Sequence, residues 1–230
     1  MNPQKEEAQA EAIRRILEVE NAQTATLDLS DLHSLNELPG ELERLTSLQT
    51  LKVWGWNELR DLTPLAGLTS LHTLCLSHCH QINDLTPLAG LTWLQTLDLG
   101  LCYELCNLSP LASLTSLQAL ELIRCEQITD LSPLAGLTSL QTLNLSRCHQ
   151  ISDLSPLAGL TSLESLDLSG CAQISDLSPL AGLRSLRSLD LPGCSQLTGD
   201  ISPLTGLRRQ LHVVLPNRLY WLLQSRQQLQ

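Results

Sequence analysis

Residues 137–159 read LTSLQTLNLSRCHQISDLSPLAG, and residues 160–182 repeat the pattern as LTSLESLDLSGCAQISDLSPLAG. The same frame returns in five more segments, at residues 45–67, 68–90, 91–113, 114–136 and 183–206. The last of these contains one extra residue near Thr198-Gly199-Asp200. A fixed period of this length is the signature of a stacked repeat architecture, in which each unit is one small structural element. Seven consecutive copies therefore predict a solenoid.

The leucines of each unit predict a short strand. In residues 163–168, Leu166 and Leu168 alternate with polar residues, as a half-buried strand requires. One strand cannot bury its inner face alone, so neighbouring units should stack into a curved parallel β-sheet over a continuous core. We expect strands centred near Leu27, Leu51, Leu74, Leu97, Leu120, Leu143, Leu166, Leu189 and Val213.

The second half of each unit predicts a short turn on the convex side. It reads D-L-[ST]-P-L-A-G-L, in which Ser155 precedes Pro156 and Gly159 soon follows. A hydroxyl as the cap, proline at the first helical position and an early glycine predict a single 3₁₀ turn. The aspartate before this turn is expected to cap its backbone, with Asn107 substituting once; the series is Asp61, Asp84, Asp130, Asp153 and Asp176.

Six of the eight cysteines recur every 23 residues, which indicates packing rather than a disulfide framework. A small apolar thiol fits beneath a tight turn and can make a weak hydrogen bond to the backbone. We therefore expect a buried, reduced ladder of Cys79, Cys102, Cys125, Cys148, Cys171 and Cys194, with Cys75 and Cys106 outside it. A metal site at His78-Cys79-His80 is the alternative, but no convergent ligand set is visible. No metal or other cofactor is predicted.

The two ends of the chain are predicted to cap the array. Residues 1–23 form a charged helix whose face of Ala12, Ile13, Ile16 and Leu17 would cover the first repeat. Residues 24–216 form the array, in which seven repeats of 23–24 residues at 45–206 are flanked by partial repeats. Residues 217–230 form the C-terminal cap and tail, with apolar residues to cover the last strand: Leu219, Trp221, Leu222 and Leu223.

Composition and charge narrow the function. The chain has 230 residues, 43% of them hydrophobic, and a formal net charge of −10. This charge repels phosphate backbones and anionic membranes, so nucleic acid is not an expected partner. No apolar run is long enough to insert into a membrane, and the first twenty residues lack a signal-peptide pattern, which favours the cytoplasm. No catalytic constellation stands out, so we do not expect an enzyme.

The unit L-x-x-L-x-L-x-x-C-x-x-[IL] resembles the leucine-rich repeat, with Cys where many members have Asn. The copies that read S-P-L-A-G-L-T-S-L-Q-T-L resemble those of bacterial internalins. Residues 11–45 resemble the start of bacterial intracellular leucine-rich-repeat arrays, such as those of Roco-type GTPases. No G-x-x-x-x-G-K-[ST] phosphate loop is present, so no GTPase activity is implied. The resemblance implies an α/β leucine-rich-repeat solenoid with helical caps.

Information about a partner should lie where the repeats differ. The central outward strand position carries Asp98 beside Glu121 and Asp167 beside Asp190, although like charges opposite each other destabilise a sheet. Nothing in the repeat pattern requires these carboxylates, and either a solubilising face or a surface for a basic partner would explain them. Large or cationic residues follow the strands and are typical of interface contacts: Trp54, Trp56, Tyr103, Ile123, Arg124 and Arg147. Trp54 and Trp56 could instead pack against the N-terminal repeat.

These observations predict a monomeric protein-interaction module that binds a protein or peptide with a basic surface on its concave face. One alternative is a structural or regulatory array that acts by tethering or self-association. Another is an internalin-like protein that interacts with a host.

Overall fold

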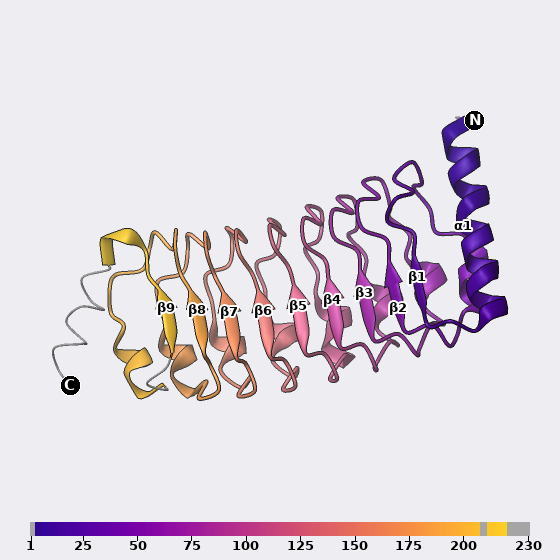
Figure 1. The fold of residues 1–230 in the computed structure, drawn as a ribbon. Coiled ribbons are helices and arrows are strands. Elements are labelled where there is room, and N and C mark those ends of the chain that lie inside the picture. The colour runs from indigo at the N-terminus through magenta and orange to yellow at the C-terminus, as the bar shows by residue number, and fades with distance from the viewer. Residues whose placement is uncertain (1–2, 208–210, 220–230) are drawn as a thin grey trace.

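The structured chain begins with helix α1, Pro3–Ala22, and continues through a regular series of very short strands (Figure 1). The computed structural model describes residues 3–207 and 211–219. In this part of the chain nine strands follow one another in a single parallel sheet, in the order β1 to β9. Their bounds are β1 Thr26–Asp28, β2 Thr50–Lys52, β3 Thr73–Cys75, β4 Thr96–Asp98, β5 Ala119–Glu121, β6 Thr142–Asn144, β7 Ser165–Asp167, β8 Ser188–Asp190 and β9 His212–Val214.

The register of the sheet follows the repeat. Leu97 pairs with Leu120, and Leu120 with Leu143, so equivalent leucines stack directly upon one another. The central residue of every described strand is the one predicted above, and each is buried. Stacked parallel strands with a leucine ladder beneath them confirm the leucine-rich-repeat solenoid with its sheet on the concave side.

A 3₁₀ turn closes every repeat on the side opposite the sheet, as the proline-containing limb predicts. The turns are η1 Gly40–Arg44, η2 Thr63–Leu65, η3 Thr86–Leu88, η4 Ser109–Ser113, η5 Ser132–Leu134, η6 Ser155–Leu157, η7 Ser178–Gly182 and η8 Ser202–Gly206. A further turn, η9, spans Asn217–Leu219 beyond the last strand. The short limb leaves room for one turn only, since longer 3₁₀ runs have poor hydrogen-bond geometry.

From η2 to η8 an aspartate, or Asn107 at η4, caps the turn, and the residue at the serine place does not. Asp153 Oδ1 accepts a hydrogen bond of 2.8 Å from the Ser155 amide, and Asn107 does the same for Ser109 at 2.9 Å. The predicted role of the Ser155 hydroxyl as the cap is therefore wrong. Ser155 is the first residue of η6, and the preceding Leu154 makes no side-chain cap. The Asp153 carboxylate is two residues before the amide that it accepts, because Asp153 forms an Asx turn at the start of η6 in place of an ordinary N-cap.

Both ends are covered within the described residues. Ala8, Ala12 and Ile16 of α1 are buried against the first repeat. Leu17, predicted for this face, is exposed, because it lies a hundred degrees around the helix from Ile16. At the other end Val213, Leu215 and Leu219 are buried. The proposed capping residues Trp221, Leu222 and Leu223, and the tail after them, lie outside the described residues.

Candidate partner-binding surface

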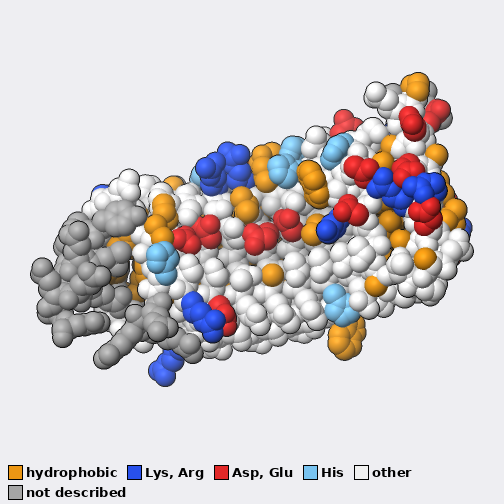
Figure 2. Space-filling model, viewed as in Figure 1, with side chains coloured by type: hydrophobic (Ala, Val, Ile, Leu, Met, Phe, Trp, Pro, Cys, Tyr) orange, Lys and Arg blue, Asp and Glu red, His pale blue; other side chains and the backbone are white. Residues whose placement is uncertain are grey.

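The outward residues of the strands form an acidic strip along the concave face, which we define as Asp98, Glu121, Asp167 and Asp190. Asp98 pairs in register with Glu121, and Asp167 with Asp190, while Asn144 separates the two pairs. Figure 2 shows the acidic side chains as a row across the middle of this face. The structure thus brings all four predicted carboxylates into one line.

Two members of the acidic strip have a structural role that the sequence analysis missed. Asp98 Oδ1 accepts a hydrogen bond from the Gly100 amide at 3.0 Å, and Asp167 Oδ1 accepts one from Ser169 at 2.8 Å. Asn144 makes the same contact to Ser146. The expectation that nothing in the repeat calls for these side chains is therefore wrong, because an Asp or Asn here pairs the backbone amide two residues on.

Glu121 and Asp190 do not share this role. The longer Glu121 side chain makes no such hydrogen bond in the described residues, and Asp190 precedes Pro192, which has no amide hydrogen to donate. Burial raises the pKa of the Glu121 carboxyl, and the neighbouring charge of Asp98 raises it further. Glu121 instead has a side-chain hydrogen bond with Asn144, and Asp190 Oδ2 accepts one from the Ser188 hydroxyl at 3.4 Å, so neither carboxylate pairs the backbone amide two residues on.

A second row of side chains runs beside the strip, on the ascending turns that follow the strands. Seven successive turns contain a residue with positive φ at the same place. In the first six of them its amide donates to the next turn, as from Arg124 to Ser146 at 2.8 Å. Glycine occupies the place at Gly55, Gly170 and Gly193. In the four turns between, the residues are His78, Leu101, Arg124 and Arg147, with φ between 57° and 62°.

A side chain in the left-handed region costs about 1 kcal/mol or more relative to glycine. The stacking of the turns imposes this backbone on every copy, so the four non-glycine residues are not chosen for conformational ease. We call the side chains that project from these turns the ridge, defined as Trp54, His78, His80, Leu101, Tyr103, Ile123, Arg124 and Arg147.

The N-terminal half of the ridge is a chain of rings in contact. The ring centroids of Trp54 and His78 lie 6.4 Å apart, those of His78 and His80 6.1 Å, and those of His80 and Tyr103 4.8 Å. His33 adds a further ring 5.6 Å from Trp54. Desolvation, with the nearby His78 charge, lowers the pKa of His80 and so favours its neutral form. Apolar and aromatic surface of this kind supplies affinity in protein interfaces.

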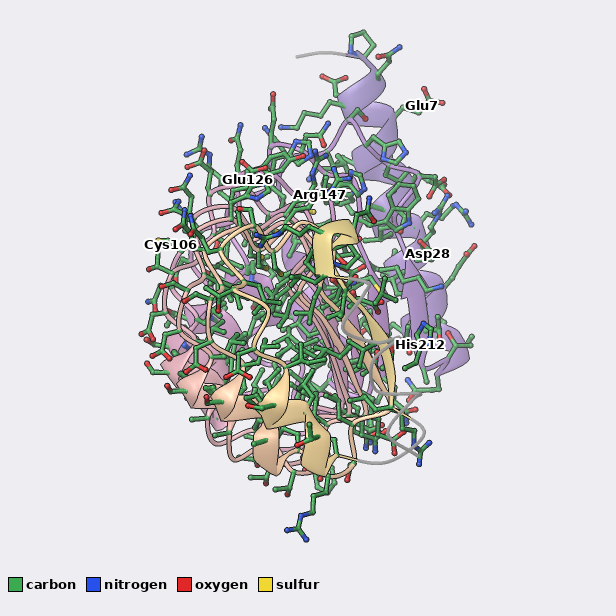
Figure 3. All side chains as sticks on the ribbon, turned by 90° about the vertical axis from the view of Figure 1, so that its left-hand side faces the viewer. Glu7, Asp28, Cys106, Glu126, Arg147 and His212 are labelled. Carbon is green, nitrogen blue, oxygen red and sulfur yellow. The ribbon has the colours of Figure 1, made fainter. Side chains whose placement is uncertain are left out.

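The other half of the ridge is cationic and without counter-ions. Neither Arg124 nor Arg147 forms an ion pair with any described residue, and the Arg124 Nε is buried without a hydrogen-bond partner. Arg147 lies over the neighbouring turn, since a Cβ on Gly170 would come within 3.2 Å of its Cγ. Figure 3 places Arg147 at the edge between the sheet side, marked by Asp28 and His212, and the turns that carry Glu126.

The two tryptophans predicted to contact a partner differ in their exposure. Trp54 has 46% of its surface exposed, whereas Trp56 is fully buried and its Nε1 donates to the Leu29 carbonyl at 3.1 Å. Trp56 occupies the place that cysteine holds in the later repeats. It therefore belongs to the core and cannot contact a partner, as the packing alternative predicted.

Sequence analysis also missed Trp93, which is 63% exposed in the loop before β4. Other repeats have Ser at this place, for example Ser70 and Ser116, so the signal was present in the repeat comparison. It was overlooked because only positions on and after the strands were compared.

The cysteine ladder lies in the core, away from both rows. All six thiols are fully buried, and each donates to a carbonyl of the preceding repeat, as Cys148 Sγ does to Leu122 at 3.1 Å. Burial raises the pKa of the Cys148 thiol to about 12. The packing interpretation is confirmed. Among the described residues, no three His, Cys, Asp or Glu side chains are grouped closely enough to hold a metal ion.

Residues 115–159, 138–182 and 161–207 match the family described as Leucine Rich repeats (2 copies). An internalin C2 structure from Listeria monocytogenes is 37% identical with a TM-score of 0.70, and the alignment covers 83% of this chain and 80% of that one. An internalin, InlF, of the same organism is 28% identical with a TM-score of 0.57, covering 81% and 68%. The chain therefore belongs to the bacterial leucine-rich-repeat proteins, with repeats of the internalin kind.

More distant structures share the fold alone. The leucine-rich-repeat domain of the type III effector XopL is 19% identical with a TM-score of 0.62, covering 95% of this chain and 91% of that one. A leucine-rich-repeat protein of Leptospira interrogans is 21% identical with a TM-score of 0.62, covering 90% and 56%. No curated protein sequence matches the chain. In the described part of the chain, no helix is both long and apolar enough to cross a membrane.

Proposed function

We propose that this chain is a protein-interaction module without catalytic activity, which binds a partner on the concave sheet face and the adjoining ridge. The basic surface of the partner lies over the acidic strip. The observation that carries this proposal is Glu121, a half-buried carboxylate beside Asp98 with no ion pair to any described residue. A cation from a partner would stabilise the charged carboxylate against both its burial and the repulsion from Asp98.

The ridge is proposed to supply most of the affinity. Tyr103 and Ile123 lie half-buried on the turns that follow β4 and β5, and Ile123 and Asp98 both flank Gly100, so a partner that covers the carboxylates also reaches these apolar side chains. Charge complementarity acts mainly on the rate of association, whereas well-packed apolar contacts act on dissociation. The two rows therefore have separable effects on binding kinetics.

The test compares affinity capture on columns of the wild-type chain and of a variant with Asp98→Asn and Glu121→Gln. Asparagine at 98 keeps the backbone contact to Gly100, because Asn144 makes that contact in its own repeat. We expect the variant to associate with the captured partner about tenfold more slowly at low salt, with a weaker salt dependence. Tyr103→Ser with Ile123→Ser should instead raise the dissociation rate.

A matched control is Ala135→Glu on the convex side, where Ala135 is exposed. Equal binding by the wild type and both face variants, with loss of binding in Ala135→Glu, would place the interface on the convex side and refute the proposal. The mass of the free chain in solution over a range of concentrations identifies self-association, which would replace a separate partner by a second copy.

A further inference from the structure

The four non-glycine residues with positive φ form one uninterrupted block. His78, Leu101, Arg124 and Arg147 occupy consecutive turns, and glycine occupies the same place on both sides of the block. Their amides donate to the following turn at 2.6–2.8 Å, so the turns are stacked and the four side chains rise in one row. Adjacent stacked strands are about 4.8 Å apart, which brings neighbouring side chains within reach of one partner segment.

Packing within the chain does not explain the block. Gly55, Gly170 and Gly193 show that the turn closes without a side chain at this place, and the left-handed backbone favours glycine. Residues with an unfavourable backbone conformation persist where their side chains have a functional role, and they cluster at sites that contact ligands. The residues two positions further on vary over the same repeats, with His80 and Tyr103 here but Ala172 and Ser195 in the C-terminal repeats.

The chemistry of the block is divided between its ends. The rings and Leu101 offer apolar surface, while Arg124 and Arg147 offer two guanidinium groups without counter-ions among the described residues. The buried Arg124 Nε lacks an acceptor, and an unsatisfied buried donor is costly to leave unpaired. A carboxylate matches the forked donors of arginine and can pair with the outer guanidinium nitrogens of Arg124 and Arg147.

We propose that the ridge receives an extended protein segment that presents carboxylates to Arg124 and Arg147 and apolar side chains to Leu101 and Tyr103. This inference rests on the proposed function and specifies the partner more closely. Basic residues of the partner lie over the acidic strip, and its acidic residues lie over the ridge. The bound segment therefore has basic side chains along one side and acidic side chains along the other.

A polypeptide fits this surface better than a nucleic acid does. Rings with arginines also stack single-stranded bases, but a phosphate backbone along the ridge would lie beside Asp98, Glu121 and Asp167. A row of carboxylates repels phosphates along their whole length. A polypeptide can instead place an acid over one row and a base over the other.

The experiment selects binders of the whole chain from a random peptide library displayed on phage. Enriched peptides are synthesised, and their Kd is measured for the wild type and for the double variant Arg124→Gly with Arg147→Gly. The variant reproduces the glycines of the other turns. Arg184→Thr is the matched control, since Arg184 is exposed on the loop before β8 where most other repeats have Thr.

The expected peptides contain Asp or Glu next to aliphatic or aromatic residues. Their Kd should rise by about tenfold or more in the double variant, as expected for lost charge-assisted hydrogen bonds. Binding to Arg184→Thr should remain near the wild-type value. The unfolding midpoint of the double variant should be equal to or above that of the wild type, because two left-handed side chains have been removed.

Enriched peptides without acidic residues, or with an unchanged Kd in the double variant, would overturn the inference. If that Kd still rises with Asp98→Asn and Glu121→Gln, the proposed binding face stands and only the ridge assignment fails. If only Ala135→Glu weakens the peptides, the proposed function fails as well. Binding of a labelled single-stranded oligothymidine that is lost in the double variant would identify a nucleic-acid site instead.

Discussion

The Cys148 thiol shows why a cysteine stands at the turn. Its Sγ donates to the Leu122 carbonyl, which also accepts the Cys125 amide, so the thiol joins an acceptor that already has a partner. An apolar side chain with a weak donor suits such a place, since leaving the thiol proton unpaired costs little.

Replacing Cys148 by Ser should lower the free energy of unfolding by about 1–3 kcal/mol, because a hydroxyl is more polar and its shorter bond reaches the carbonyl less well. Denaturant unfolding measures the loss. Cys106→Ser is the control, since Cys106 is exposed and should tolerate the change. Rapid labelling of Cys148 by a thiol reagent in the native chain would contradict its burial.

At this scale the sequence predicted classes of residue better than individual ones. Trp54 and Trp56 look alike in the sequence, yet one is exposed and the other lies in the core, because Trp56 replaces a ladder cysteine. Comparison with Cys79, one period later, would have shown this. The left-handed turns were less accessible, since His78, Leu101 and Arg124 contradict the residue preference that marks such a backbone.

The 3₁₀ turns depend on a side chain outside them. Asp153 accepts the Ser155 amide. Hydrogen bonding by the Ser155 side chain, and then by this amide, lowers the pKa of the Asp153 carboxyl. The lowered pKa means that the charged form stabilises the folded state. This contribution is present at neutral pH and is lost as the pH falls through the pKa of the folded chain.

Replacing Asp153 by Ala should therefore lower the thermal midpoint of the chain by a few degrees or less, because one amide at the start of η6 loses its acceptor. Asp153→Asn should stay close to the wild type, since Asn107 already caps η4. Calorimetry at pH 7 compares the three. Equal midpoints for Ala and wild type would show that water replaces the cap without loss.

The elements themselves were well predicted, because one leucine spacing repeated along the chain leaves a single register. Every described strand is centred where the sequence placed it, from Leu27 to Val213. The turn caps were predicted correctly for Asp and Asn but not for Ser155. The structural role of the outward Asp98 and Asp167 was not predicted. An aspartate that accepts a nearby backbone amide cannot be told from one that faces a partner by the sequence alone.

At the scale of the whole molecule, the regular core contains six buried thiols in one row. The six ladder thiols are buried in one continuous cluster of leucines, and burial raises the pKa of each. Cys79, Cys125 and Cys148 reach about 12, and Cys194 about 11, from an ordinary value of 9.0. Since the folded pKa lies above the unfolded one, the stabilisation is complete below pH 9 and is lost as the pH rises toward 11–12.

We therefore expect steep alkaline unfolding. Within this window each thiol lowers the free energy of unfolding by about 1.4 kcal/mol per pH unit, so six lower it by about 8 kcal/mol per pH unit. That change is comparable to the whole stability of an ordinary domain. The sheet signal in circular dichroism should be lost cooperatively between about pH 10 and 11, and the ultraviolet absorption of thiolates should rise together with this loss.

Cys148→Ala isolates the contribution of one ladder thiol. The variant should be less stable at pH 7 because of the atom removed, yet the slope of its free energy of unfolding against pH should be smaller by about 1.4 kcal/mol per unit. Denaturant unfolding at several pH values from 8 to 10 gives both slopes. Thiolate absorption that appears near pH 9 while the circular dichroism is unchanged would mean that water reaches the ladder in the folded solenoid, and the core would then be more open than its buried leucines and thiols indicate.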